Sequence, residues 1–196
     1  MKNWNSKNKI ATAVLLFVVI FSWWLICKNQ WLPSYILPSP FQVLSTLIEL
    51  RTDFYSATVS TFTSALIGFL ASAILGYILA VIFSFYSVLR SAILPLAVFF
   101  QTVPIIAIAP LLVIWFGFGE RTVQVSAFVV SFFPVLASSL VGLASEDIQL
   151  LEMLKVYDAN KIHTFWHLKI PSSWPFVFSG LRVSSGLAVI GAIVGE

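Results

Sequence analysis

The stretch EMLKVYDANKIHTFWHLKIP, residues 152–171, is the longest polar interruption in an otherwise apolar sequence. Its charged residues alternate in sign from Glu152 through Lys155 and Asp158 to Lys161, and Lys169 follows. Its apolar residues recur every three or four positions, which is typical of an amphipathic helix or helix pair. We expect Pro171 and Pro175 to end this helix, because proline cannot donate the next helical hydrogen bond. The stretch is therefore predicted to lie against a partner outside the membrane.

The composition around this stretch is that of an integral membrane protein. Hydrophobic residues make up 59% of the chain and charged residues 10%, whereas soluble domains carry about 25% charged residues. The net charge of +3 comes from basic residues spread over several loops, which suits membrane topology better than nucleic-acid binding. A single cysteine, Cys27, excludes an internal disulfide framework.

The apolar runs predict an all-α polytopic protein with about five spans in a single transmembrane domain, residues 1–196. The first run follows a basic N-terminus, as in a signal peptide. No small-x-small cleavage site comes after the run, so we expect an uncleaved span. Residues 41–50 are too short to cross the membrane and predict an interfacial helix. The expected spans are residues 10–27, 57–83, 92–116, 122–144 and 174–195.

The second run carries small residues at every fourth position, so that they form one stripe on a helix. Small side chains allow another helix backbone to approach closely. We therefore predict that Gly68, Ser72 and Gly76 pack against a second helix.

The third run is interrupted by prolines and by Gln101 and Thr102. A broken membrane helix with polar residues at its middle is a candidate lining of a transport pathway, and we assign Gln101, Thr102 and Pro104 to the pathway or gate. The alternative is a kinked structural helix whose polar groups are satisfied by its neighbours. A tight loop that includes Gly117, Gly119, Glu120 and Arg121 follows.

The distribution of basic residues predicts the orientation. An N-terminus on the inner side places eight basic residues inside, namely Lys2, Lys7, Lys9, Arg90, Lys155, Lys161, Lys169 and Arg182. The outer side receives three, Lys28, Arg51 and Arg121. This asymmetry follows the positive-inside rule and places residues 152–171 in the cytoplasm.

The sequence offers little for catalysis or metal binding. His163 and His167 are four residues apart, but no third ligand and no adjacent glutamate base accompany them, so we expect no metal site and no catalytic residue. A membrane-embedded enzyme or an ion-coupled secondary transporter would place ionisable residues inside the spans, where this chain has almost none. No phosphate-binding GxxxxGK[ST] loop is present either.

The polar stretch resembles the cytoplasmic motif of permeases from binding-protein-dependent ABC importers. That motif reads Glu-Ala-Ala, three residues, Gly, nine residues, Ile-x-Leu-Pro. Here Glu152-Met-Leu opens it, Asp158 stands at the glycine, and Leu168-Lys-Ile-Pro171 closes it at the same spacing. Leu37-Pro-Ser-Pro and the stretch from Gln101 to Gly117 resemble the branch that imports nitrate, sulfonates, taurine and thiamine-precursor pyrimidines. The stretch after Gln101 is most similar to the pyrimidine and riboflavin-type members.

The resemblance implies a type I permease fold in the bacterial plasma membrane with a cytoplasmic N-terminus. Residues 146–171, the coupling segment, would dock on a separate cytoplasmic ATPase that binds the ATP, while this chain binds no cofactor. An extracytoplasmic solute-binding protein would deliver the substrate, contacting the loop at Gly117 to Arg121, and a second permease copy would complete the pathway within the lipid. The residues expected to face the ATPase are Glu152, Lys155, Asp158, Ala159, Asn160 and Lys161.

The sequence departs from this family at two points. Asp158 replaces a glycine, which can take a positive φ at low cost. Either the turn is retained with aspartate, or this permease couples poorly to its ATPase. Members of the branch also carry a sixth span after a position like Glu196. The missing span leaves open a truncated, non-transporting remnant, and an ion-coupled secondary transporter is the other alternative to an importing permease.

Overall fold

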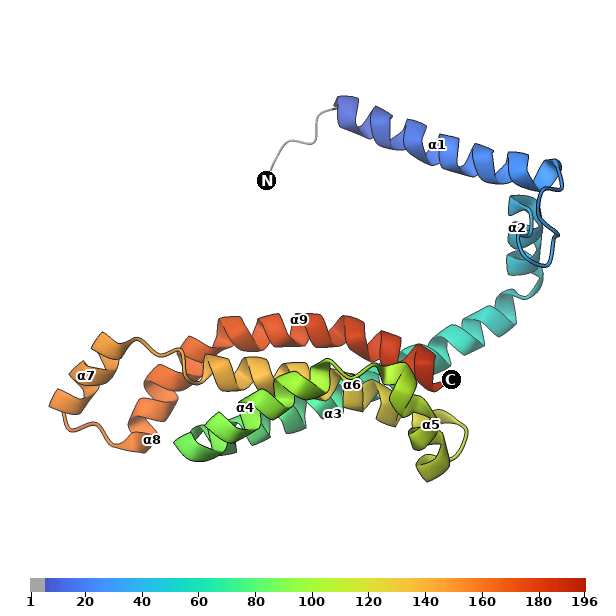
Figure 1. Cartoon of the computed structure of the whole chain (residues 1–196). Helices are drawn as coiled ribbons and strands as arrows, with labels where there is room; N and C mark the ends of the chain where they lie inside the picture. Colours follow the sequence, from blue (N-terminus) through green and yellow to red (C-terminus); the bar gives the residue numbers. More distant parts are fainter. Residues whose placement is uncertain (1–5) are drawn as a thin grey trace. The chain divides into compact units, whose positions relative to one another are not determined.

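The computed structural model describes residues 6–196, in which every regular element is helical (Figure 1). Lys2, one of the basic residues counted for the orientation, lies outside the described residues. The elements are α1 (Ser6–Lys28), α2 (Pro40–Glu49), α3 (Arg51–Ser84), α4 (Ser87–Gln101), α5 (Ile105–Phe116), α6 (Glu120–Gly142), α7 (Ile148–Val156), α8 (Lys161–Thr164), the π-helix η1 (Phe165–Lys169) and α9 (Ile170–Gly195).

The helices account for the expected spans. Four helical segments of the described chain are long and apolar enough to cross a membrane: Ala11–Lys28, Arg51–Ser84, Glu120–Gly142 and Lys161–Gly195. The bent pair α4 and α5 makes a fifth if it counts as one span. The prediction of an all-helical protein with about five spans is confirmed.

The contacts between residues divide the chain into two compact units. The sequence suggested a single domain over residues 1–196. The first unit ends at Ala57 and the second runs from Thr58 to Glu196. In the first unit, Ser39 and Gln42 form a capping box at the start of α2, with Pro40 as its first helical residue. The apolar side chains of α1 are largely exposed within the chain, as expected of a helix that faces lipid.

The core of the second unit is the close antiparallel packing of α6 against α9, which lie side by side in Figure 1. Gly142, at the end of α6, lies against Ser173 near the start of α9, and Gly191 lies against the backbone of Ser126 near the start of α6. Ser184 Oγ in the middle of α9 donates a hydrogen bond of 2.9 Å to Ser131 O. Helices in lipid gain stability from such close contact, because burial of apolar surface offers them little.

The small-residue stripe of α3 packs on the same helix α6. A Cβ atom at Gly68 would lie 2.6 Å from Ala127 Cβ, and one at Gly76 would lie 3.1 Å from Val135 Cγ1. Ser72 is fully buried between them. The two contacts advance in the same direction along both helices, so α3 and α6 run parallel.

The expectation that Pro171 and Pro175 end the helix is wrong. Helical structure continues from Lys161 to Gly195 through both prolines. The π-helix η1 precedes Pro171, and Ile170 N–H donates to Phe165 O, five residues back instead of four. This wider turn shifts the hydrogen bonding where the proline ring would otherwise clash with the preceding turn.

We predict that Gly191→Ala lowers the stability of the helix pair. The new methyl group would lie 2.8 Å from Ser126 O and 2.9 Å from Ala127 Cα, which are backbone atoms and cannot rotate away. Overpacking of this kind costs about 1–3 kcal/mol. The measurement is thermal unfolding of the purified protein in detergent, with Gly186→Ala in the same helix as the control, because no side chain or neighbouring helix lies within 4 Å of its Cβ position. Equal stability of the two variants would contradict the close packing.

Candidate functional site

The coupling segment lies at one end of the α6 and α9 pair, where it leaves α6 and returns to α9 (Figure 1). Asp147 caps the N-terminus of α7 by accepting a hydrogen bond of 2.8 Å from Gln149 N–H. No residue of α7 is buried. The helix therefore presents its side chains, Glu152 and Lys155 among them, to a partner or to solvent.

The turn between α7 and α8 is built around Asp158. Its φ of 51° is left-handed. Ala159 N–H donates to Leu154 O at 3.0 Å and Asp158 N–H donates to Lys155 O at 3.1 Å. These two bonds form a Schellman motif, in which the left-handed position usually belongs to glycine. The turn is retained with aspartate in that position.

Asn160 starts the second arm of the segment. Its side chain accepts a hydrogen bond of 2.7 Å from His163 N–H and so caps α8, a role that the sequence prediction did not include. Asp158, Ala159 and Asn160 line a groove of about 470 Å³, together with Leu154, Tyr157 and His163. Five of the six residues predicted to face an ATPase are exposed, and Ala159 is half-buried in this groove.

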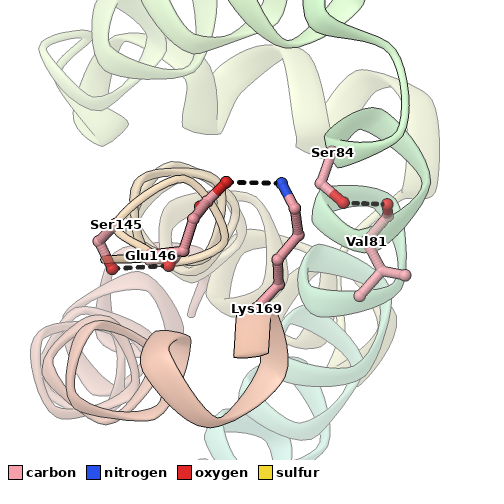
Figure 2. Close-up of polar contacts among 6 residues, drawn as sticks. Val81, Ser84, Ser145, Glu146 and Lys169 are labelled. Atoms are coloured by element: carbon pink, nitrogen blue, oxygen red, sulfur yellow. Dashed lines mark hydrogen bonds and ion pairs between the residues drawn. The ribbon is translucent and has the colours of Figure 1, made fainter. Parts of the chain in front are cut away.

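The returning arm is anchored in the core. Phe165 and Leu168 of η1 are buried, and the ring of Phe165 packs 4.9 Å from that of Phe85. Lys169 Nζ forms an ion pair with Glu146 Oε1 at 2.8 Å (Figure 2). Sequence reasoning missed this pair, because no periodicity links two residues at opposite ends of the segment.

The two histidines of this arm stack on each other. The ring centroids of His163 and His167 are 4.0 Å apart, and His167 Nδ1 lies 3.0 Å from His163 O. Among the described residues, no group of three or more His, Cys, Asp or Glu side chains is placed to hold a metal ion.

The second candidate site is the break between α4 and α5, where the helix axis bends by 96°. The expected span at residues 92–116 is thus two helices joined at Thr102 to Pro104. Thr102 Oγ1 donates to Phe99 O at 2.7 Å, and Pro104 is the N-cap of α5. Gln101 Nε2 lies 3.5 Å from Phe133 O of α6, at the limit of a hydrogen bond.

A cavity of about 620 Å³ opens beside this break. Gln101 lines it, whereas Thr102 and Pro104 do not. Five of the lining residues are aromatic, and the rings of Phe100 and Phe133 are stacked 4.8 Å apart. The lining residues are Leu75, Ile78, Leu79, Phe100, Gln101, Val103, Ile105, Ile108, Leu112, Trp115, Phe128, Val129, Val130, Phe132, Phe133, Pro134 and Leu187, none of which is charged.

The loop after α5 lies at the end of the α6 and α9 pair opposite the coupling segment (Figure 1). Gly117 and Gly119 both have positive φ values, 79° and 122°, which permit the sharp turn from α5 into α6. Thr122 Oγ1 donates to Gly117 O and ties the loop to the first turn of α6. Glu120 and Arg121 are exposed there.

Comparison with known proteins places this architecture in a family. Residues 72–196 match the family of the binding-protein-dependent transport system inner membrane component. The chain is 34% identical to the formylaminopyrimidine transport permease protein ThiX of Halalkalibacterium halodurans over 183 residues, covering 93% of this chain and 73% of that protein. It is 31% identical to the riboflavin transport system permease protein RibX of Chloroflexus aurantiacus, with coverage of 93% and 69%. It is 25% identical to the taurine transport system permease protein TauC of Escherichia coli, with coverage of 98% and 73%.

The matches define the class of protein as a multi-pass membrane permease of an ABC importer. The chain belongs to the binding-protein-dependent transport system inner membrane component family. The coupling segment and the stretch after Gln101 predicted membership of this family, and the prediction is confirmed. The assignment to the branch that contains pyrimidine, riboflavin and taurine permeases is confirmed as well.

We predict that Asp158→Gly preserves the turn and that Asp158→Val loosens it. A left-handed conformation costs an ordinary L-residue about 1–2 kcal/mol, and a β-branched side chain tolerates it poorly. The measurement is amide hydrogen exchange at Ala159, whose N–H closes the turn on Leu154 O. Valine should accelerate this exchange and glycine should leave it slow. Equal exchange in both variants would contradict the role of residue 158 in the turn.

Proposed function

We propose that this chain is the permease subunit of an ATP-driven importer in which the coupling segment docks on a separate cytoplasmic ATPase. Family membership and the exposed side chains of α7 and of the turn into α8 support the docking. Val156, Tyr157 and Ile162 are 83%, 76% and 66% exposed, which suits a surface that a partner covers. The chain itself contains no phosphate-binding loop of the GxxxxGK[ST] type, so ATP is bound and hydrolysed by the partner.

The proposed cycle uses the two ends of the α6 and α9 pair. Closure of the ATPase dimer moves the coupling segment, and the movement passes into α6 and α9. A second copy of the chain completes the pathway, and the loop at Gly117 to Arg121 meets the solute-binding protein on the outer side. The excess of basic residues on the side of the coupling segment supports a cytoplasmic N-terminus.

We further propose that the substrate is a small neutral molecule with an aromatic ring, as in the pyrimidine and riboflavin-type relatives. Stacked phenylalanines suit a flat ring, and Gln101 offers both a donor and an acceptor for ring substituents. A sulfonate or nitrate would need a cationic or strongly donating group, and the lining residues of this cavity include no lysine or arginine.

The docking proposal predicts that Glu152→Arg weakens binding of the ATPase. Glu152 is exposed in the middle of α7, where a reversed charge meets the partner surface directly. Loss of a charge pair at an interface lowers affinity by about tenfold or more. The measurement is a pull-down from membranes that co-express the tagged chain with its genomically adjacent ATPase. Glu49→Arg, which reverses an exposed charge on α2, is the control, and equal retention of ATPase by both variants would refute the docking.

The pathway proposal predicts that Gln101→Leu lowers uptake of a pyrimidine substrate by about fivefold, the equivalent of one hydrogen bond worth about 1 kcal/mol. Leucine keeps the size of the side chain and removes its polar atoms. The measurement is uptake of a labelled aminopyrimidine in cells that express the whole transporter. Gln124→Leu in α6 is the control, because that half-buried glutamine does not line the cavity. Unchanged uptake in Gln101→Leu would mean that Gln101 is structural.

A further inference from the structure

We infer that Glu146 and Lys169 are a positioning pair that joins the two ends of the coupling segment. While the ion pair is formed, a movement imposed on α7 and α8 is passed to α6 and α9 at the same time. The inference rests on the proposed docking of the segment. Glu146 lies between the end of α6 and the start of α7, and Lys169 is the last residue of η1, directly before α9. Their ion pair of 2.8 Å therefore connects the two ends of the coupling segment (Figure 2).

The pair differs from the other charges of the segment in its burial. The side chain of Glu146 is 12% exposed and that of Lys169 is 23% exposed, whereas Glu152, Lys155 and Lys161 are exposed to solvent. Water and salt screen a partly buried ion pair less than a surface pair. The attraction between Glu146 and Lys169 is thus of a kind that can hold two chain segments in register.

The two arms of the segment depend on this pair unequally. The returning arm is held by Phe165 and Leu168, which are buried against the core. Leu143, just before the segment begins, is fully buried, but no residue of α7, the departing arm, is buried. The ion pair of Glu146 with Lys169 therefore ties the departing arm directly to the returning one.

No other described residue pairs with the Glu146 carboxylate in the place of Lys169. Glu146 Oε2 is buried and has no hydrogen-bond partner in the described part of the chain. The two hydroxyl groups drawn beside the pair in Figure 2 are engaged elsewhere, since Ser145 Oγ donates to Gly142 O at 2.8 Å and Ser84 Oγ donates to Val81 O at 2.7 Å. Removal of Lys169 would leave a buried carboxylate without a counter-charge, whereas removal of Glu146 leaves a lysine whose long side chain can reach water.

This asymmetry predicts the order of effects in a double-mutant cycle. The variants are Lys169→Met, Glu146→Gln and the double variant, in the complete transporter reconstituted with its ATPase and binding protein in proteoliposomes. The readout is the amount of substrate taken up per ATP hydrolysed, because a merely structural defect lowers both rates together and leaves their ratio unchanged. Lys28→Met, which removes the same charge outside the coupling segment, is the matched control.

We expect Lys169→Met to retain the ATPase and to lower uptake per ATP by about tenfold, with a smaller loss in Glu146→Gln and recovery to within about threefold in the double variant. An unchanged ratio in Lys169→Met would overturn the inference. A double variant as impaired as Lys169→Met would also overturn it, because Lys169 would then act without Glu146.

A charge exchange between the two residues tests the same pairing if Lys169→Met does not accumulate in the membrane. The charge-exchanged double variant Glu146→Lys with Lys169→Glu should then show a higher ratio than Glu146→Lys alone, and equal ratios would overturn the pairing. Failure of the wild-type chain to bind the ATPase in the same preparation would refute the proposed docking instead.

Discussion

Close contact between α6 and α9 is the constraint on which the second unit depends. In lipid, apolar side chains gain little by moving from the bilayer to a helix interface, so association depends on packing and on interhelical hydrogen bonds. Gly142 and Gly191 let the two backbones approach, and the bond from Ser184 to Ser131 crosses the interface. The stripe of α3 then adds a third helix against α6 through Gly68 and Gly76, and Ala65 of α3 packs in one cluster with residues of both α6 and α9.

This rigid helix pair gives the site its geometry. The coupling segment leaves one end of the pair, and the loop at Gly117 to Arg121 lies at the other end. The cavity at the α4 and α5 break opens against residues of α6, among them Phe132 and Phe133. In the account proposed here, a movement that begins at α7 and α8 reaches the cavity through α6, because tightly packed helices move as bodies rather than bending continuously.

Sequence reasoning identified the features that depend on local pattern. The small-residue period of α3, the polar interruption at residues 152–171 and the proline-rich break after Gln101 all correspond to distinct elements of the structure. What it missed depends on contacts between distant residues or on backbone detail. The prolines at 171 and 175 suggested an end to the helix, but the π-helix before them allows it to continue. The pairing of Glu146 with Lys169 and the bend of 96° arise from tertiary packing, which no single window of sequence contains.

The central claim is that the α7 and α8 end of the molecule meets the ATPase, and site-specific photo-crosslinking tests it most directly. The photoreactive residue p-benzoylphenylalanine would replace Lys155 on α7 in one variant and Arg121 at the opposite end in another. Both side chains are exposed, so neither replacement disturbs the core. We expect illumination of membranes to link the ATPase to position 155 and not to position 121. Capture of the ATPase from position 121 instead would contradict the orientation and the docking together.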